Sequence, residues 1–422
     1  MNILQTKKGI NQRFNTLLVR EVKAVQIAHL KREFELAELS RVAEAACALS
    51  AEAITAWEKE QGINRLRPGE MLLEKNDISI VLPFLNERAL MQLKAGTSYR
   101  AVKRELEICQ LEQLKRANPD AGLEDLWRLT NQAELVLQRT SGDFLPEEKL
   151  DPGKITPAGQ ERFNAQIPEL ALAPAIESLI DDWGLRPAQA EAMSLSAARL
   201  YAWCCPYFSS LNPGQIVWLV YGTKKSRNHD QRHFQPVVLT LWTPQDQVMP
   251  LLTTRDLKRL KTVQLERITR EAWKQDGVLT ALDLEWLLGI SGATIRKILD
   301  AYREKFGIIL PTAGTVLDMG RTLTHKTFVV DLALSGFNTQ EIAARICHSP
   351  VAVDNYLRLF ERVLLLKYYR FPVAVMPRVT GFSKGLLNEH LKLVDKHFPT
   401  EELQAEYLGQ RGIQLEKISK GI

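Results

Sequence analysis

The chain has 422 residues, of which 45% are hydrophobic and 25% charged, as in ordinary soluble globular proteins. No run approaches the roughly eighteen apolar residues that a membrane-spanning helix needs, and the start lacks the apolar segment of a signal peptide. The five cysteines show no CxxC spacing. We therefore expect a cytoplasmic protein with reduced, mostly buried thiols and no membrane partner.

The net charge of +5 is unevenly distributed along the chain. Residues 1–250 carry 30 basic against 31 acidic side chains, whereas residues 251–422 carry 25 against 19. A basic C-terminal part favours a polyanionic partner, although the excess is small for a dedicated nucleic-acid binder.

In chain order, the sequence reads as two divergent copies of one unit, about Ala24–Phe163 and Ile176–Thr324, joined by a linker at Gln166–Ala175. Each copy contains a helical landmark, a Pro-Gly turn, a β-like run and an amphipathic helix. The paired landmarks are Ala48–Trp57 with Ser194–Trp203, Leu66–Met71 with Leu211–Ile216, Asp77–Leu85 with Pro236–Trp242, and Gly96–Ala117 with Thr253–Gln275. Because they keep their order, we infer a tandem repeat.

The second copy contains an insertion, Tyr221–Pro236, between two short apolar runs rich in β-branched residues. This pattern predicts a hairpin with a basic loop. We expect Lys224 and Lys225 in the loop, and Arg259 and Lys261 in the following helix, to contact phosphates. His229, Asp230 and His233 lie within five residues, and the two histidines have a metal-ligand spacing. No cysteine or second acidic residue joins them nearby, so a solvated basic tip is the favoured interpretation.

A helix-turn-helix motif is predicted in Leu284–Leu299, LEWLLGISGATIRKIL. Gly289 suits a turn residue with positive φ, and Ser291 suits the cap of a second helix. Ile295 and Ile298 would form the buried face of that helix. The residues then expected to contact DNA are Ser291, Thr294, Arg296 and Lys297. The counterpart in the first copy, Gly122–Arg139, keeps the apolar frame but not this polar surface.

A second helix-turn-helix follows in Leu334–Phe360. Thr339 begins its first helix, Cys347 stands at the turn where glycine is usual, and Ser349 with Pro350 begins the second helix. Residues expected to contact DNA here are His348, Ser349, Asn355 and Arg358. Asp354 would also point outward, where it would repel phosphate. The tail Ser383–Phe398 reads as one amphipathic helix that packs on this module or pairs with a second subunit.

Several of these stretches resemble an uncharacterised bacterial and archaeal family known only as a domain of unknown function, family 1670. The resemblance rests on Gly320–Val363 and on the segments NPGQIVWLVYG, PVVLTLWTPQD and LLGISGATIRKIL. It covers about the second half of the chain and implies a helix-turn-helix protein. The second motif is also loosely similar to the DNA-binding modules of LuxR-type regulators and of sigma-factor region four, which implies base contacts from Ser349 to Arg358.

The sequence thus predicts a mainly α protein with small β-hairpins (α+β), built from a tandem repeat and helix-turn-helix modules. The expected parts are a degenerate first copy (1–165), a second copy (166–324), a second helix-turn-helix (325–370) and a helical tail (371–422). The predicted function is sequence-specific binding of duplex DNA by a transcriptional regulator or mobile-element accessory factor.

Two alternatives stay open: a protein-interaction scaffold whose helix-turn-helices are structural, and a DNA-processing nuclease or transposase. The sequence shows no phosphate-binding loop, nucleophile elbow or HExxH helix. It therefore names no catalytic residue, metal ligand or cofactor, and it leaves open a homo-oligomer formed through the C-terminal helix.

Overall fold

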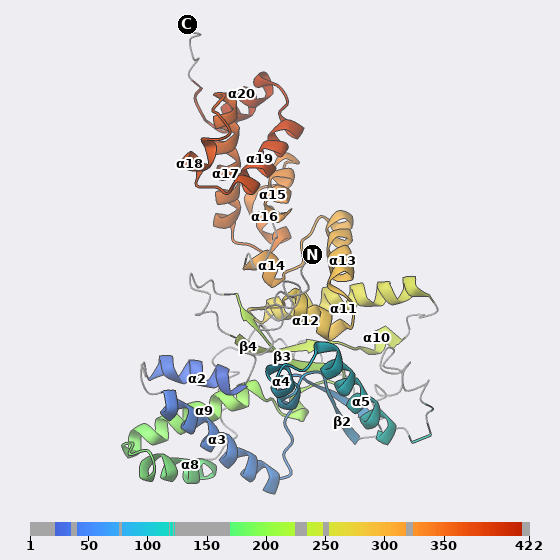
Figure 1. Cartoon of the computed structure of the whole chain (residues 1–422), viewed down its shortest axis with the longest axis vertical. Helices are drawn as coiled ribbons and strands as arrows, with labels where there is room; N and C mark the ends of the chain where they lie inside the picture. Colours follow the sequence, from blue (N-terminus) through green and yellow to red (C-terminus); the bar gives the residue numbers. More distant parts are fainter. Residues whose placement is uncertain are drawn as a thin grey trace. The chain divides into compact units, whose positions relative to one another are not determined.

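The structure, a computed structural model, describes residues 22–34, 40–75, 78–117, 119–120, 122, 169–223, 234–247, 253–317 and 324–415. The chain is mainly helical with one small antiparallel sheet, so the predicted fold class is confirmed (Figure 1). It divides into two compact units, residues 1–295 and 296–422. The four parts proposed from the sequence, with their three boundaries, stay a prediction. Within the described ranges, no helix combines the length and the apolar character that crossing a membrane requires.

Four helices of the first unit pack against one another: α2 (Val22–Glu33), α3 (Ser40–Glu60), α8 (Glu169–Asp181) and α9 (Pro187–Cys204). Leu30, Leu179 and Met193 are fully buried at their centre. Alanines in the same core keep the side chains between the helices small, which allows the helix axes to approach closely: Ala43, Ala46, Ala190 and Ala197. Cys47 and Cys204 are buried free thiols, as expected from the sequence.

The sheet of the first unit contains β1 (Glu70–Lys75), β2 (Ile78–Pro83), β3 (Gln215–Gly222), β4 (Phe234–Thr240) and the short β5 (Gly277–Val278). Its order is β2-β1-β3-β4, with β5 paired to the end of β3, and every pairing is antiparallel. The two β-like runs of the sequence therefore form β2 and β4. A short 3₁₀ helix, η3 (Phe208–Ser210), precedes the turn into β3.

The turns before β1 and β3 each bond to the opposite strand in a reciprocal way. The N–H of Gly69 donates to the carbonyl of Val217, and the N–H of Gly214 donates to the carbonyl of Leu72, each at 2.7 Å. At this junction Met71 of β1 pairs with β3. The β1–β2 and β3–β4 hairpins thus occupy equivalent places on either side of the junction, which gives the internal repeat a structural counterpart.

Both turns require glycine for the same two reasons. Gly69 and Gly214 have positive φ values of 91° and 88°. A Cβ at Gly69 would lie 1.8 Å from the carbonyl oxygen of Leu85, and one at Gly214 would lie 2.2 Å from that of Trp242. The Pro-Gly pairs that mark the repeat in the sequence are therefore fixed by close backbone packing.

Each edge strand of the sheet has a long helix beside it. α4 (Glu87–Lys94) and α5 (Tyr99–Ala117) follow β2, and α5 contacts that strand. α10 (Pro244–Gln247) and α11 (Thr254–Lys274) follow β4, and α11 contacts that strand. Edge strands leave backbone groups unpaired, and covering them with a helix prevents pairing with another chain. On the β2 side, the Gln110 amide donates to the carbonyl of Pro83 at 2.7 Å.

α12 (Ala281–Leu288) completes the described part of the first unit, and α13 (Gly292–Phe306) continues from it into the second. The second unit then contains α14 (Ala313–Val316), α15 (Thr324–Leu334), α16 (Thr339–Ile346), α17 (Pro350–Tyr368), α18 (Met376–Thr380), α19 (Lys384–His397) and α20 (Glu401–Gln410). α15, α16 and α17 pack together, and Phe360 of α17 is fully buried at the centre of the unit.

The predicted amphipathic tail is α19, and it packs on α17. Leu387 lies in a cluster with Val363 and Met376, and Val394 lies in the cluster around Phe360. The apolar face that we considered for pairing with a second subunit is therefore used within the module itself.

Candidate nucleic-acid interface

The turn between α12 and α13 has the local geometry predicted from the sequence. Gly289 ends α12 in the left-handed conformation, with φ at 66°, and its N–H donates to the carbonyl of Glu285. The Ser291 hydroxyl accepts from the N–H of Thr294 at 3.3 Å, which caps the start of α13. The helical pattern is thus interrupted at Gly289–Ser291 by a turn whose ends are capped by hydrogen bonds.

α13 has one buried and one exposed face. Ile295 and Ile298, predicted as its buried side, are each 1% exposed. Arg296 and Lys297 are exposed, and Thr294 is half-buried. The two basic side chains expected to contact DNA therefore face solvent.

The first helix of this motif is fixed to the sheet. The indole N–H of Trp218 in β3 donates to the Asp283 carboxylate at 3.0 Å, and that carboxylate also accepts from the cap residue Thr280. The indole N–H of Trp286 donates to the carbonyl of Phe84, which follows β2. Because most of α12 is buried, α13 presents the polar surface of this motif.

The second motif also contains the predicted turn, with cysteine in the position of glycine. Cys347 follows α16 in the left-handed conformation, φ 54°, and its N–H donates to the carbonyl of Ala343. At the other end of α16, Asn338 and Glu341 form a reciprocal capping box. The cap is Asn338, and α16 starts at Thr339, as predicted from the sequence.

α17 begins as predicted, with Ser349 as its cap and Pro350 in its first turn. The Ser349 hydroxyl accepts from the N–H of Ala352 at 3.2 Å. Ser349 itself is exposed at the start of the helix. An exposed, capped helix start is where the second helix of such motifs approaches a phosphate.

One face of α17 carries a stripe of exposed side chains. Its members recur every three or four residues, and we call them the α17 stripe: Val351, Asn355, Arg358 and Arg362. Asn355 and Arg358 are DNA contacts expected from the sequence. Arg362 was not named there; it lies seven residues, or two helical turns, after Asn355 and is exposed on the same face.

Two side chains expected to point outward are held inside the second motif. The His348 ring contacts the carbonyl oxygen of Thr315 through Nε2 at 2.8 Å and lies edge-on to Tyr356. The Thr339 hydroxyl donates to the Asp354 carboxylate at 3.0 Å. One nitrogen of the His348 ring is thus engaged inside the motif, and its expected DNA contact stays a prediction. Asp354 joins α16 to α17, and its half-buried carboxylate is engaged in that contact.

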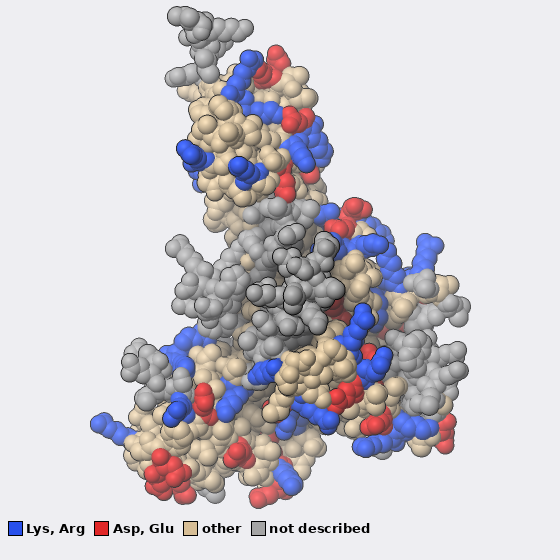
Figure 2. All heavy atoms as spheres, viewed as in Figure 1, with Lys and Arg blue, Asp and Glu red and all other residues tan. Residues whose placement is uncertain are grey.

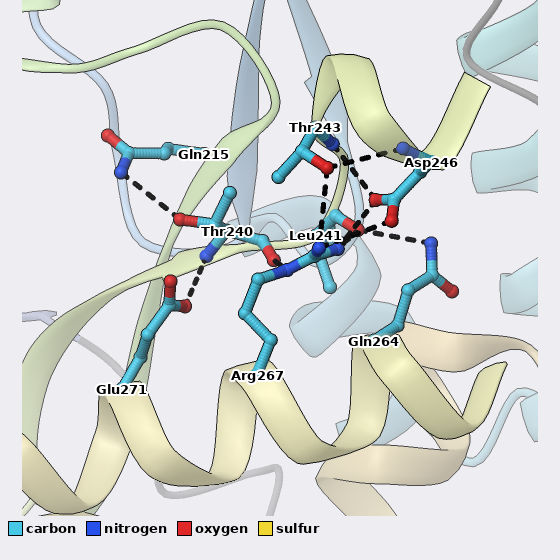
Figure 3. A network of polar contacts seen from close by, with 8 residues as sticks. All are labelled: Gln215, Thr240, Leu241, Thr243, Asp246, Gln264, Arg267 and Glu271. Carbon is cyan, nitrogen blue, oxygen red and sulfur yellow. Dashed lines mark hydrogen bonds and ion pairs between the residues drawn. The ribbon is translucent and has the colours of Figure 1, made fainter. Parts of the chain in front are cut away.

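The polar face of α11 is engaged with β4 rather than free for phosphates. The Arg267 guanidinium donates to the carbonyls of Thr240 and Leu241 at 2.8 and 2.9 Å, and it pairs with Asp246 at 2.6 Å (Figure 3). The Gln264 amide donates to the same Leu241 carbonyl at 3.1 Å. These contacts tie the end of β4 and the following turn to α11.

Further along α11, two side chains bond the open edge of β4 as a neighbouring strand would. Glu271 accepts from the N–H of Thr240 at 2.6 Å, and Gln275 both accepts from and donates to the backbone of Val238. Burial raises the pKa of Glu271 to about 7, although the bond from Thr240 and the charge of Arg267 act in the opposite direction. The spacing of Gln264, Arg267, Glu271 and Gln275 is that of one helix face.

The four residues predicted to contact phosphates lie in different surroundings. Arg259 is exposed on α11, whereas Lys261 is half-buried and lines a cavity. Lys224 and Lys225 lie outside the described residues. The exposed basic side chains of α11 are Arg255, Lys258, Arg259, Arg270 and Lys274.

Acidic and basic side chains are interspersed over the face shown in Figure 2. The distribution of charge therefore does not mark a nucleic-acid surface on that face, and a nucleic-acid interface has to be argued from particular residues. In the ranges that the structure describes, no group of three or more His, Cys, Asp or Glu side chains could hold a metal ion. The loop with His229 and His233, and the first-copy motif Gly122–Arg139 from residue 123 on, lie outside those ranges.

A family model described as a protein of unknown function, DUF1670, matches residues 182–393. The chain belongs to this family. The matched part of this DUF1670 protein includes the β3–β4 hairpin, both helix-turn-helix motifs and most of α19. No curated protein and no solved structure matches the chain, and the looser similarity to LuxR-type and sigma-factor modules is not shown.

Proposed function

We propose that this DUF1670 protein binds duplex DNA sequence-specifically through α17 and α13, as a transcriptional regulator or an accessory factor of a mobile element. The observation that carries the proposal is the α17 stripe, because it lies on the second helix of a compact three-helix module. In helix-turn-helix proteins, that helix enters the major groove and places three or four side chains on base edges.

The side chains of the α17 stripe have the chemistry that base reading needs. An asparagine can make two hydrogen bonds to adenine, and an arginine can make two to guanine. A methyl-bearing side chain such as Val351, which is 68% exposed, suits contact with the methyl group of thymine. The stripe therefore combines two hydrogen-bonding types with one apolar contact.

α13 supports the same function through charge. Arg296 and Lys297 are adjacent and exposed, and the capped start of their helix is exposed at Ser291. Helix starts and basic side chains both attract phosphate. We assign phosphate contact to these residues and base reading mainly to the α17 stripe.

The test begins with selection of bound fragments from a random duplex library, using the full chain. Binding of the selected duplex is then measured by fluorescence anisotropy for the parent, Arg358→Ala and Arg378→Ala. Arg378 is an exposed arginine on α18, outside the stripe, and serves as the matched control. Loss of one base-reading arginine weakens binding by about 10- to 100-fold and relaxes preference at one position. Equal affinities for the two variants would count against the proposal.

An exposed apolar segment favours a second candidate, a protein-interaction scaffold. In and around the connection from α17 to α18, Phe371, Val373, Val375 and Val379 are 43%, 51%, 42% and 57% exposed. Clustered exposed apolar side chains mark protein contacts. If this segment joins two copies, sedimentation velocity of the parent shows a dimer that Val373→Asp dissociates. A monomer in both cases removes self-association through this segment.

A further inference from the structure

The first unit contains a cavity of about 320 Å³ between α5, α11 and the end of α12. Three aromatic side chains, Phe84, Trp242 and Trp286, form part of its wall. Leucines from all three helices, among them Leu106, Leu257 and Leu288, supply more apolar surface. The volume is at the lower end of the range seen for small-molecule sites, and apolar walls with few polar groups are typical of such sites.

Two lysines from different helices line this apolar cavity: Lys103 of α5 and Lys261 of α11. Burial lowers the pKa of Lys103, and the charge of Glu107 opposes this effect. Burial also lowers the pKa of Lys261, to about 8, and the positive charge of Lys103 lowers it further, against the effect of Asp246. Among the described residues, neither ammonium group has a hydrogen bond or an ion pair.

The two lysine charges destabilise the protein when the cavity is empty, and they would stabilise a bound anion. Two like charges with reduced access to water destabilise each other, and an anion between them would remove that repulsion. Glu107, which also lines the cavity, offsets one of the two positive charges. The remaining charge matches a single anionic group, and the aromatic walls match a flat apolar part.

We propose that the cavity between α5, α11 and α12 binds a small molecule that carries one anionic group, held by Lys103 and Lys261, and an aromatic or apolar body, held by Trp242 and Trp286. A carboxylate, a sulfonate and a phosphate ester share this chemistry.

The cavity also contacts the turn of the first helix-turn-helix, because Gly289 and Ile290 form part of its wall. A bound molecule would touch the turn from which α13 starts. An effect of the ligand on DNA affinity would rest on the proposed function. Binding of the small molecule to the cavity does not depend on that function, so the experiment below measures it without DNA.

The probe is 8-anilinonaphthalene-1-sulfonate, a fluorescent aromatic monoanion, titrated into the full-length protein at pH 7. We expect saturable binding that benzoate or phenyl phosphate displaces. Lys261→Met and Lys103→Met keep the apolar length of the side chain and remove its charge, and each weakens binding about tenfold or more. The matched control is Lys258→Met, an exposed lysine on the same helix, which leaves affinity unchanged.

Two further measurements separate the cavity from other binding modes. Leu257→Trp places a larger side chain in the cavity and leaves both lysines intact, so we expect it to abolish binding. This variant keeps the proposal testable if a lysine variant fails to fold. Affinity for the parent also falls as the pH rises through about 8, where Lys261 loses its charge. No saturable binding, or equal binding by the parent, Lys261→Met and Leu257→Trp in their folded states, overturns the proposal.

Discussion

Glu271 makes the stability of the first unit depend on pH in an unusual direction. Its pKa is raised in the folded protein from the ordinary 4.5 to about 7, chiefly by burial. Below pH 4.5 both states hold the proton, and the group contributes nothing to pH dependence. Between 4.5 and 7 the unfolded chain loses the proton first, so stability falls as the pH rises, and above 7 the full penalty remains.

The substitution Glu271→Gln removes this titration and keeps an oxygen that can accept from the N–H of Thr240. A shift from 4.5 to about 7 corresponds to about 3.5 kcal/mol at most, at about 1.4 kcal/mol per pKa unit. The variant is therefore expected to be more stable than the parent by up to about this amount at pH 8. The difference should shrink towards zero near pH 4.5.

Urea unfolding followed by tryptophan fluorescence measures this difference selectively. All eight tryptophans lie between Trp57 and Trp286, in the first unit, so the signal reports on that unit alone. Glu266→Gln is the control, because Glu266 pairs with Arg270 at the surface of the same helix, and such pairs contribute about 0.5 kcal/mol. A variant with the pH dependence of the parent, or one less stable than the parent at pH 8, would refute the reasoning.

Three other substitutions test separate parts of the account. Gly214→Ala should destabilise the first unit by about 3 kcal/mol or more, since it adds a backbone clash to a left-handed φ; Gly184→Ala, with a left-handed φ and open space, should cost about 1 kcal/mol in the same urea assay. Cys347→Val should lower the melting temperature measured by circular dichroism, because a β-branched side chain tolerates a φ of 54° less well than cysteine does; Cys109→Val in α5 should not lower it. Arg296→Ala with Lys297→Ala should weaken DNA binding and reduce its salt slope by about 2, and an unchanged slope would argue against phosphate contact.

The parts of the structure that local chemistry determines were predictable from the sequence. The turn at Gly289, the cap at Ser349 and the left-handed turn at Cys347 each depend on residues within one helical turn of each other. The two Pro-Gly turns were also recognisable in the sequence, because both must keep their glycines for close packing, whereas the tandem repeat inferred from them stays a prediction. The reciprocal pairing of β1 with β3 was not visible, since it joins Met71 to a residue far along the chain.

Several contacts of the candidate site could not be predicted from the sequence, because the partners come from elsewhere in the chain. α11 reads as a basic helix, but the sequence does not show that Arg267 faces the edge of β4. His348 and Asp354 occupy outward positions in an ideal helix-turn-helix, yet Thr315 and Thr339 hold them inside. Lys261 was assigned to phosphate because its place in an apolar cavity depends on α5, more than a hundred residues earlier.

The most direct test of sequence-specific DNA binding compares two duplexes with the full-length protein at physiological salt. One is the fragment obtained by selection, and the other has the same base composition in scrambled order. The account predicts that the selected duplex binds at least about 10³-fold more tightly, as specific sites do relative to non-specific DNA. Equal affinity for the two duplexes, or no binding to either, would contradict it.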